Sequence, residues 1–530
     1  MTTALLMPLH PEPKWVPTEH DPFVGKDILE LLSSSMYVDP MSMYREYIQN
    51  AADAVELARS TGVLSSRGRV HIRIDQSSRS VSIRDNGAGL GNAEFVDQLM
   101  ALGGSKKRGT SLRGFRGVGR LAGLAFCQEL VFRSRQSGEP TVHELRWDSR
   151  EIRGLLRSAD RRQNLKEVIT RGVQKREVRC QNYPARFFEV ELKGVVRHRD
   201  DRLLSHEAVN RYLAQVAPVG FHSDFGFAQA IESFLRAHGV PSGVLDIELV
   251  DYGPVFRPHR NVVAMGKSGE TRFRELRTLV TPGRDAGTAA VTWSLDHDYR
   301  GALPTSSLIE GWRFRAGDIQ VGDNALLQAL FPESRFNAWC VAETHVLDPR
   351  ILPNGRRDHF EQNAHYFDLL NHLAPQVREI AQRCRNSSIA RNLVRTIDTR
   401  LTECAERIRI LEKGTLAAKS AGKIIRALQN TLQHLQRISA KNSIAPERQR
   451  DYQLQIDRLQ QRLGRVASDS RRMSILRAFP PSQRPLLVEV FAAIYQADDN
   501  LQHAQTLVDT IVSRLRRARR RPRKRKIARR

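Results

Sequence analysis

The stretch MYREYIQNAADAVELA, beginning at Met43, contains three polar side chains at helical intervals among many small and apolar residues. Glu46, Asn50 and Asp53 are spaced i, i+4 and i+7, so they share one face of the predicted helix. A solvated face would explain an isolated pattern of this kind. Here the neighbouring residues are small or apolar, among them Ile48, which fits a helix that packs on a core and turns its polar groups toward a ligand.

A pair of strands is predicted after this helix. Val70, Ile72 and Ile74 alternate with polar residues, and so do Val81 and Ile83, which indicates two adjacent half-buried strands. The segment therefore combines helical and strand patterns.

The second strand ends in the sequence IRDNGAGL, which contains Asp85, Gly87 and Gly89. A carboxylate at a strand end can accept a hydrogen bond from an exocyclic amine, and glycines let the backbone approach a flat ligand closely. An Asp-Asn-Gly turn would be the simpler explanation if this stretch stood alone.

A third element, GFRGVGRLAG, carries Gly114, Gly117 and Gly119 in front of an apolar helical pattern. Backbone amides at such a helix start could cradle phosphates. One glycine cluster is weak support for a phosphate site, but the three elements occur in this order between Glu46 and Gly119. Together they predict one ligand site that includes a phosphate-binding part.

The chain changes character along its length. Residues 21–200 mix helical and strand patterns, residues 203–361 form a second mixed segment with strand-like runs such as TAAVTWSL and WRFRAGDIQV, and residues 362–513 are helical in pattern. The expected fold class is α+β with an all-α C-terminal region. A short segment, residues 1–20, precedes these parts, and a basic tail, residues 514–530, follows them.

The helical region is expected to be interrupted at Pro446 and at Pro480 and Pro481. Two apolar stripes with 4-3-4-3 spacing fit coiled-coil packing, and they fit the faces of an ordinary helical bundle equally well. The stripe residues are Ile397, Leu401, Cys404, Ile408 and Leu411 in one run and Tyr452, Ile456, Leu459, Leu463 and Val466 in the other.

The net charge of +26 favours a polyanionic partner such as nucleic acid. Twelve basic residues lie in the tail 514–530, and the rest of the chain would keep a charge of +14 without them. Five scattered cysteines indicate neither a disulfide framework nor a zinc site. No leader peptide or membrane span is recognisable, so we expect a protein of the cytosol or the chromosome and no membrane partner.

The three elements resemble those of the GHKL ATPases, the superfamily of DNA gyrase, histidine kinases, MutL-type repair proteins and the ninety-kilodalton heat-shock chaperones. The chaperone (HtpG-like) branch is the most similar, because ILELLSSSMYVDPMSMYREYIQNAADAVELAR resembles its first helices over the whole length. LSHEAVNRYLAQVAPVGF and VLDPRILPNGRRDHFE are similar to two segments of its middle domain. The resemblance implies a Bergerat-fold α/β sandwich for residues 21–200 and a ribosomal-S5-like α/β middle domain for residues 203–361.

The resemblance also implies roles for individual residues, with ATP and Mg²⁺ as cofactors. Glu46 would be the general base that activates the attacking water, and Asn50 would bind Mg²⁺ through its side-chain oxygen. Asp53 would support that site or the packing of the helix, and Asp85 would accept the adenine amino group. Gly87 and Gly89 would line the base and ribose. The lid and phosphate loop would contain Lys106 and the backbone amides of Gly114, Gly117, Val118 and Gly119.

Arg357 matches the middle-domain arginine that reaches the γ-phosphate, and it would supply its charge only when the two domains close. The adjacent Arg356 is a competing candidate from the sequence alone. The chain departs from the family pattern at two places. Glu361 stands where the chaperones carry a glutamine, and PARFFEVEL replaces the Gly-Thr pair that opens the last strand of the ATPase domain.

The expected function is that of a slow, ATP-hydrolysing molecular clamp that closes when nucleotide binds and forms a homodimer. It would act on nucleic acid, held in part by the tail 514–530, or on a protein client bound to the C-terminal helices. Two alternatives are a folding chaperone with no nucleic-acid role and an ATP-switched scaffold without significant turnover.

Overall fold

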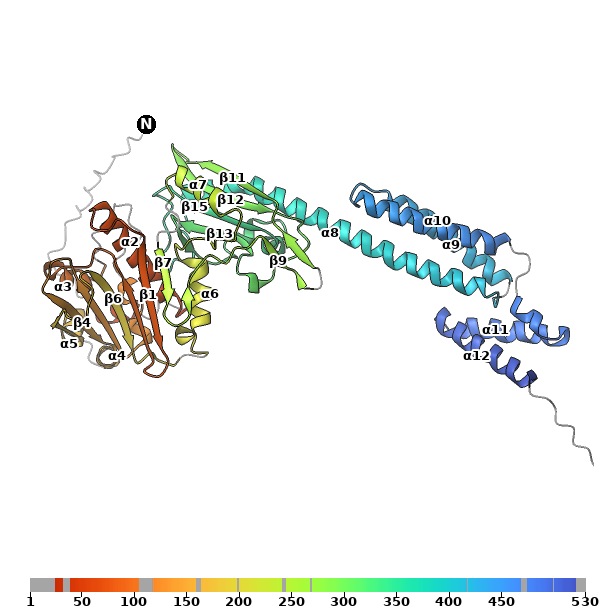
Figure 1. The fold of residues 1–530 in the computed structure, drawn as a ribbon, viewed down its shortest axis with the longest axis horizontal. Helices are drawn as coiled ribbons and strands as arrows, with labels where there is room; N and C mark the ends of the chain where they lie inside the picture. Colours follow the sequence, from red (N-terminus) through yellow and green to blue (C-terminus); the bar gives the residue numbers. More distant parts are fainter. Residues whose placement is uncertain are drawn as a thin grey trace, which may run out of the picture. The chain divides into compact units, whose positions relative to one another are not determined.

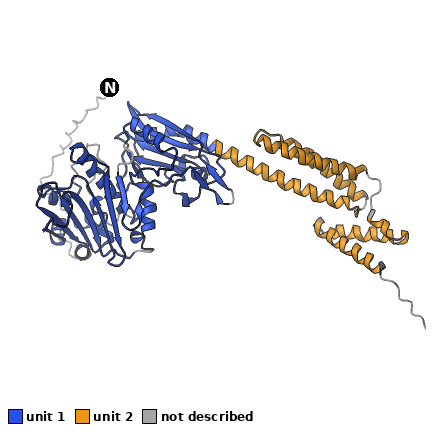
Figure 2. Cartoon of the chain, in the orientation of Figure 1, with its two compact units in different colours: residues 1–381 blue, residues 382–530 orange. Residues whose placement is uncertain are grey.

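The fold of the chain divides into two compact units, residues 1–381 and 382–530 (Figure 2). Mixed helices and strands followed by a helical region were predicted, and this is confirmed (Figure 1). Residues 1–20, Lys106, Gly114, Val118 and residues 521–530 lie outside the described part of the chain. The computed structural model describes residues 24–31, 39–103, 117, 119–158, 164–197, 200–240, 245–266, 269–416, 418–468, 474–498 and 500–520.

Unit 1 contains two large sheets, and the first of them has eight strands. Its strand order is β5-β4-β3-β6-β2-β1-β7-β8, and every neighbouring pair is antiparallel except β1 and β7. The two strands predicted around Val70 and Val81 are present and adjacent. The strands are β1 (Gly68–Asp75), β2 (Ser80–Asp85), β3 (Glu129–Arg135), β4 (Thr141–Asp148), β5 (Val173–Arg179), β6 (Phe187–Lys193), β7 (Leu245–Leu249) and β8 (Gly253–Pro254).

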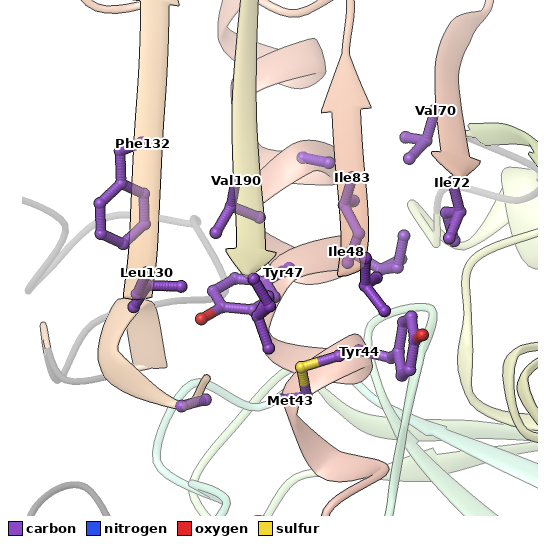
Figure 3. Close-up of a cluster of buried hydrophobic side chains, with 14 of the residues drawn as sticks. Met43, Tyr44, Tyr47, Ile48, Val70, Ile72, Ile83, Leu130, Phe132 and Val190 are labelled. Carbon is purple, nitrogen blue, oxygen red and sulfur yellow. The ribbon is translucent and has the colours of Figure 1, made fainter. Parts of the chain in front are cut away.

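Helix α2 (Ser42–Ser60) covers one face of this sheet. Its sequence is rich in alanine and contains neither glycine nor proline, which favours a long regular helix. Figure 3 shows its apolar side chains meeting those of β1, β2, β3 and β6, and these residues belong to one buried core. Four shorter helices complete this part: α1 (Asp27–Glu30), α3 (Asn92–Met100), α4 (Ser149–Arg157) and α5 (Leu165–Gly172).

The other face of the sheet carries a row of alternating charges. Arg84, Glu189, Arg133, Glu144 and Arg176 are successive register partners on β2, β6, β3, β4 and β5. Arg84 Nε lies 2.6 Å from Glu189, Arg133 lies 2.7 Å from Glu189 and 2.8 Å from Glu144, and Arg176 pairs with Glu144. Opposite charges that face each other across strands stabilise this register, because a shift by one residue would turn them toward the apolar core.

The second large sheet of unit 1 has five strands, in the order β11-β12-β15-β13-β14. The predicted strand TAAVTWSL is β12, and WRFRAGDIQV forms most of β13 and all of β14. The elements of this part are α6 (His206–Val216), α7 (Ala228–Ala237), β9 (Val262–Ala264), β10 (Glu270–Arg272), β11 (Glu275–Pro282), β12 (Thr288–Asp296), β13 (Gly311–Ala316), β14 (Ile319–Val321) and β15 (Val341–Val346).

A buried group of charges joins this second sheet to the chain that leaves the first. Arg257 follows β8, Arg315 lies on β13 and Glu343 on β15, and each is at most 2% exposed. Arg257 Nη1 lies 2.6 Å from Glu343 Oε2, and Arg315 donates to both carboxylate oxygens at 2.9 and 3.0 Å. Arg315 also donates to the carbonyl of Gln215 at the end of α6. Charges this deeply buried are stable only while they are paired.

Unit 2 is entirely helical in its described residues. The two predicted stripes lie in one core shared by three helices of the same chain, the arrangement of a helical bundle. The proline predictions are confirmed, since α10 begins at Pro446 and α11 follows Pro480 and Pro481, but α8 continues through Pro375. The helices are α8 (Ala364–Glu412, shared with unit 1), α9 (Ala418–Ser439), α10 (Pro446–Ser468), α11 (Arg484–Ala497) and α12 (Leu501–Arg520).

Across the described helices, including the long α8, none is both long enough and apolar enough to span a bilayer.

Candidate functional site

Helix α2 holds the three polar residues that opened the sequence argument. Glu46, Asn50 and Asp53 lie on successive turns of one helix. Glu46 and Asp53 are buried, at 7% and 2% exposed, and Asn50 is half-buried. The prediction that they do not form a solvated face is therefore confirmed.

The carboxylate of Glu46 lies between a guanidinium group and a glycine loop. Arg357 Nε is 3.2 Å from Glu46 Oε1, and Arg45 Nε is 3.9 Å from the same oxygen. On the other side, a Cβ added to Gly119 would lie 2.4 Å from Glu46 Oε2. The backbone of the predicted phosphate loop thus lies so close to Glu46 that a larger residue at position 119 would displace the carboxylate.

The loop that carries Arg357 is fixed by backbone contacts. Arg357 has a φ of 56°, a left-handed conformation that a non-glycine residue adopts only when its surroundings hold it there. Its carbonyl accepts hydrogen bonds from the Gly322 amide at 2.9 Å and from Arg45 Nη1 at 3.2 Å. Arg45 Nη2 also donates to the carbonyl of Arg356 at 2.8 Å. Arg357 is buried and Arg356 exposed, so Arg357 is the arginine that meets Glu46.

Asp85 lies on the face of β2 that α2 covers, together with Val81 and Ile83. Its Oδ1 accepts a hydrogen bond from the Gly87 amide at 2.8 Å. Burial raises the pKa of Asp85 to about 7, although the Gly87 hydrogen bond and the charge of Arg186 oppose that rise. A carboxyl group with this pKa changes its protonation state near neutral pH.

Gly87 and Gly89 allow close packing with the protein itself. A Cβ on Gly87 would lie 2.6 Å from the Cβ of Ala54 on α2, so this glycine lets the turn rest on the helix. Gly89 has a φ of 68°, and a Cβ there would lie 2.3 Å from the Arg135 carbonyl oxygen. A side chain at either position would therefore collide with α2 or β3, and the approach of a ligand to the backbone of this turn stays a prediction.

The described part of the phosphate loop is tied to α2. Gly117 has a φ of 70°, and its carbonyl accepts a hydrogen bond from Arg120 Nη2 at 3.0 Å. Tyr47 Oη accepts from the Gly123 amide at 2.8 Å and donates to the Arg120 carbonyl at 3.2 Å. Helix α2 therefore positions both the acidic residues and the loop that faces them.

Sequence reasoning missed Arg45 and Arg120. Arg45 directly precedes Glu46, and its contacts with Arg356 and Arg357 join residues far apart in the chain. Arg120 lies inside the glycine-rich motif, where a basic residue beside the glycines was the available signal. In the described ranges, no three His, Cys, Asp or Glu side chains are grouped so that they could hold a metal ion.

Residues 41–170 match the family described as "Histidine kinase-, DNA gyrase B-, and HSP90-like ATPase". The chain is 30% identical over 141 residues to the chaperone protein HtpG of Acinetobacter baylyi, covering 23% of this chain and 22% of the relative. It is 31% identical over 148 residues to HtpG of Rickettsia akari, covering 24% and 23%. These matches confirm the resemblance to GHKL and HSP90-like ATPases, and the chain spans less than a quarter of the length of these two relatives.

Proposed function

We propose that this chain binds ATP with Mg²⁺ and hydrolyses it slowly, as a nucleotide-controlled clamp of the chaperone-like GHKL type. The observation that carries this proposal is the 3.2 Å contact of Glu46 with Arg357, which brings a carboxylate and a guanidinium together from distant parts of the chain. Transfer of a phosphoryl group to water uses one residue that positions the water and a positive charge that stabilises the phosphoryl group. The match of residues 41–170 to an ATPase family supports the same conclusion.

Glu46 orients a water molecule and accepts its proton as the water attacks the γ-phosphate. Asn50, one turn further along α2, offers a neutral side-chain oxygen, and Asp53 supports it from the next turn. This set of hard oxygen donors fits Mg²⁺ held together with phosphate oxygens. When bound there, Mg²⁺ would supply positive charge that offsets the charge of the phosphates.

The two ends of the nucleotide are assigned to different elements. Asp85 accepts the adenine amino group, and the turn of Gly87 and Gly89 lies beside the base and ribose. The amides of Gly117 and Gly119 face the phosphates. Completing the lid and phosphate loop are Lys106, Gly114 and Val118, which lie outside the described residues. Arg357 binds the γ-phosphate and stabilises the charge that develops during its transfer.

Adenosine should bind more tightly as the pH rises through 7. Only the ionised form of Asp85 accepts two hydrogen bonds freely, and with a pKa of about 7 the affinity should increase roughly tenfold between pH 6 and pH 8. Adenosine carries no phosphate that titrates in this range. Calorimetry at several pH values measures the effect, which Asp85→Asn should abolish. An equal pH dependence in both proteins would show that Asp85 does not bind the base.

Gly119→Ala should lower ATP turnover by about tenfold or more, with little loss of stability. The new Cβ would meet the end of the flexible Glu46 side chain, so the carboxylate must turn away while the fold keeps its shape. Phosphate release and thermal unfolding measure the two effects. Gly154→Ala is the matched control, because nothing lies within 4 Å of its new Cβ and turnover should be unchanged. Equal turnover in both variants would contradict the placement of Glu46.

Helices α11 and α12 are the proposed surface for a second copy of the chain or a protein client. Their exposed large apolar side chains are Leu486 and Val490 on α11 and Leu507 and Leu515 on α12. Exposed apolar side chains can contribute to a contact with another protein where they form one patch. Light scattering of the full chain with and without Mg-ATP would show a nucleotide-dependent dimer, and a constant monomer mass would reject it.

Nucleic acid is the second candidate partner, favoured by the exposed arginines near the end of α12. Arg514, Arg516 and Arg517 are all exposed. Replacing these three with glutamine should reduce the slope of log affinity for duplex DNA against log salt by roughly 3. Filter binding over a salt series measures the slope. If the wild type shows no salt-dependent binding, the nucleic-acid role is rejected and the chaperone role stands.

The central proposal is tested by calorimetry and phosphate release on the full chain. We expect ATP to bind in the presence of Mg²⁺, to bind more weakly with EDTA, and to be hydrolysed slowly. Binding without hydrolysis would favour the ATP-switched scaffold. Absence of magnesium-dependent binding would reject the nucleotide site.

A further inference from the structure

The first sheet is completed by strands from the second mixed segment. β7 pairs with β1 in parallel over five register partners, from Gly68 and Leu245 to Ile72 and Leu249. These strands come from opposite sides of the boundary that the sequence predicted near residue 200. The segment that carries Arg357 is therefore attached to the ATPase-like segment by backbone hydrogen bonds as well as by the continuous chain.

The buried charges strengthen this attachment. Arg257 follows the last strand of the first sheet, and it donates to the Val219 carbonyl and to Glu343 of the second sheet. Arg315 joins the same carboxylate to α6. Separating the two sheets would break the hydrogen bonds that Arg257 and Arg315 make to the carbonyls of Val219 and Gln215.

Arg45 makes the third connection, at the site itself. Its guanidinium donates to the carbonyls of Arg356 and Arg357 while its own helix carries Glu46. Carbonyl contacts hold a loop whatever its side chains do. The guanidinium of Arg357 can therefore move from one anion to another while its backbone stays in place.

We infer that the two sheets stay docked throughout the nucleotide cycle, and that Arg45 is the positioning residue that keeps Arg357 beside Glu46. In the step controlled by nucleotide, one side chain then changes its anionic partner while the two sheets stay docked. Arg357 leaves the Glu46 carboxylate for the γ-phosphate, and Glu46 becomes free to accept a proton from water. This inference rests on the proposed function. It replaces the expectation that Arg357 is delivered by closure of two domains within one chain.

A reversible disulfide across β1 and β7 tests the docking. His71 and Glu248 are register partners, and both are about half exposed on the face away from the site. The variant His71→Cys/Glu248→Cys is made with Cys180→Ser, since the other four cysteines are buried. The matched control is Arg73→Cys/Ser82→Cys, a register pair of β1 and β2 within one segment. We expect both disulfides to form equally well without nucleotide, and the oxidised proteins to hydrolyse ATP within about twofold of the reduced ones.

Two results would overturn the inference: a β1–β7 disulfide that forms only with nucleotide, or an oxidised protein whose turnover falls about tenfold and returns with reductant. If both disulfides form but no protein binds ATP, the docking stands and the proposed function fails. The two failures are therefore distinguishable.

The role of Arg45 is tested by separating kcat from KM. Arg45→Met should lower kcat about tenfold while KM for ATP changes less than about threefold, because the loop is needed for the chemical step and less for binding. Arg45→Lys should restore part of kcat. Arg356→Ala is the control, since only the carbonyl of Arg356 is bonded to Arg45 and activity should be kept. Equal losses in kcat for Arg356→Ala, or a kcat unchanged in Arg45→Met, would reject the assignment.

Discussion

Glu46→Gln should lower ATP turnover by at least about a hundredfold while the affinity for Mg-ATP stays within about threefold. Glutamine has nearly the same shape as glutamate and can still hold a water molecule, but it cannot accept the water's proton at neutral pH. It also cannot pair ionically with Arg357, which lies 3.2 Å from the carboxylate in the described structure. Binding of nucleotide depends on other residues, so loss of the base should appear in kcat.

Phosphate release at saturating ATP measures this effect, and calorimetry measures the affinity. Glu56→Gln is a matched control, because Glu56 is a carboxylate on the same helix near its other end. Its turnover should equal that of the wild type. If Glu46→Gln hydrolyses ATP as fast as Glu56→Gln, then Glu46 is not the general base.

Glu343→Gln should lower the free energy of unfolding of unit 1 by about 3–5 kcal/mol. The substitution leaves Arg257 and Arg315, each 1% exposed, without their shared carboxylate. These two arginines hold the pKa of Glu343 well below its usual range despite its burial. The stabilisation is therefore present above the pKa of an unfolded glutamate and is lost only as the pH falls through the lower folded value. The decrease in the free energy of unfolding caused by Glu343→Gln should therefore be the same at every pH between 6 and 8.

Urea unfolding followed by tryptophan fluorescence reports this change, since Trp293 and Trp312 are fully buried in the same sheet. Glu333→Gln is the matched control. Glu333 pairs with the exposed Arg335 at 2.7 Å, and such a surface pair should contribute less than about 1 kcal/mol. Equal urea midpoints for the two variants would show that the buried ion pairs of Glu343 do not stabilise unit 1.

Local patterns in the sequence predicted much of the fold. The alternation of Val70, Ile72 and Ile74 determined the strand β1, and the helical spacing of Glu46 and Asn50 placed both on one face of α2. These patterns depend on neighbours a few residues away, so a single sequence contains them. The resemblance to a known family then singled out Arg357, whose meeting with Glu46 no local pattern shows.

Contacts between distant residues were not predictable in the same way. Nothing in LDIEL says that β7 pairs with β1, because a parallel pair is set by the packing of the whole sheet. The role of Arg45 depends on carbonyls of Arg356 and Arg357, which have no signature in the sequence. Pro375 lies inside the helix α8, although proline usually ends a helix, so proline alone does not set the helix boundaries.

The pairing of β1 with β7 also affects how the protein is made. During translation β1 leaves the ribosome long before residues 245–249, and its outer edge has no partner until they follow. An unpaired strand edge can pair with other chains, so early folding of the first segment alone would expose an edge that promotes aggregation. The two mixed segments should therefore fold as one cooperative body, and a protein cut near residue 200 would carry that open edge permanently.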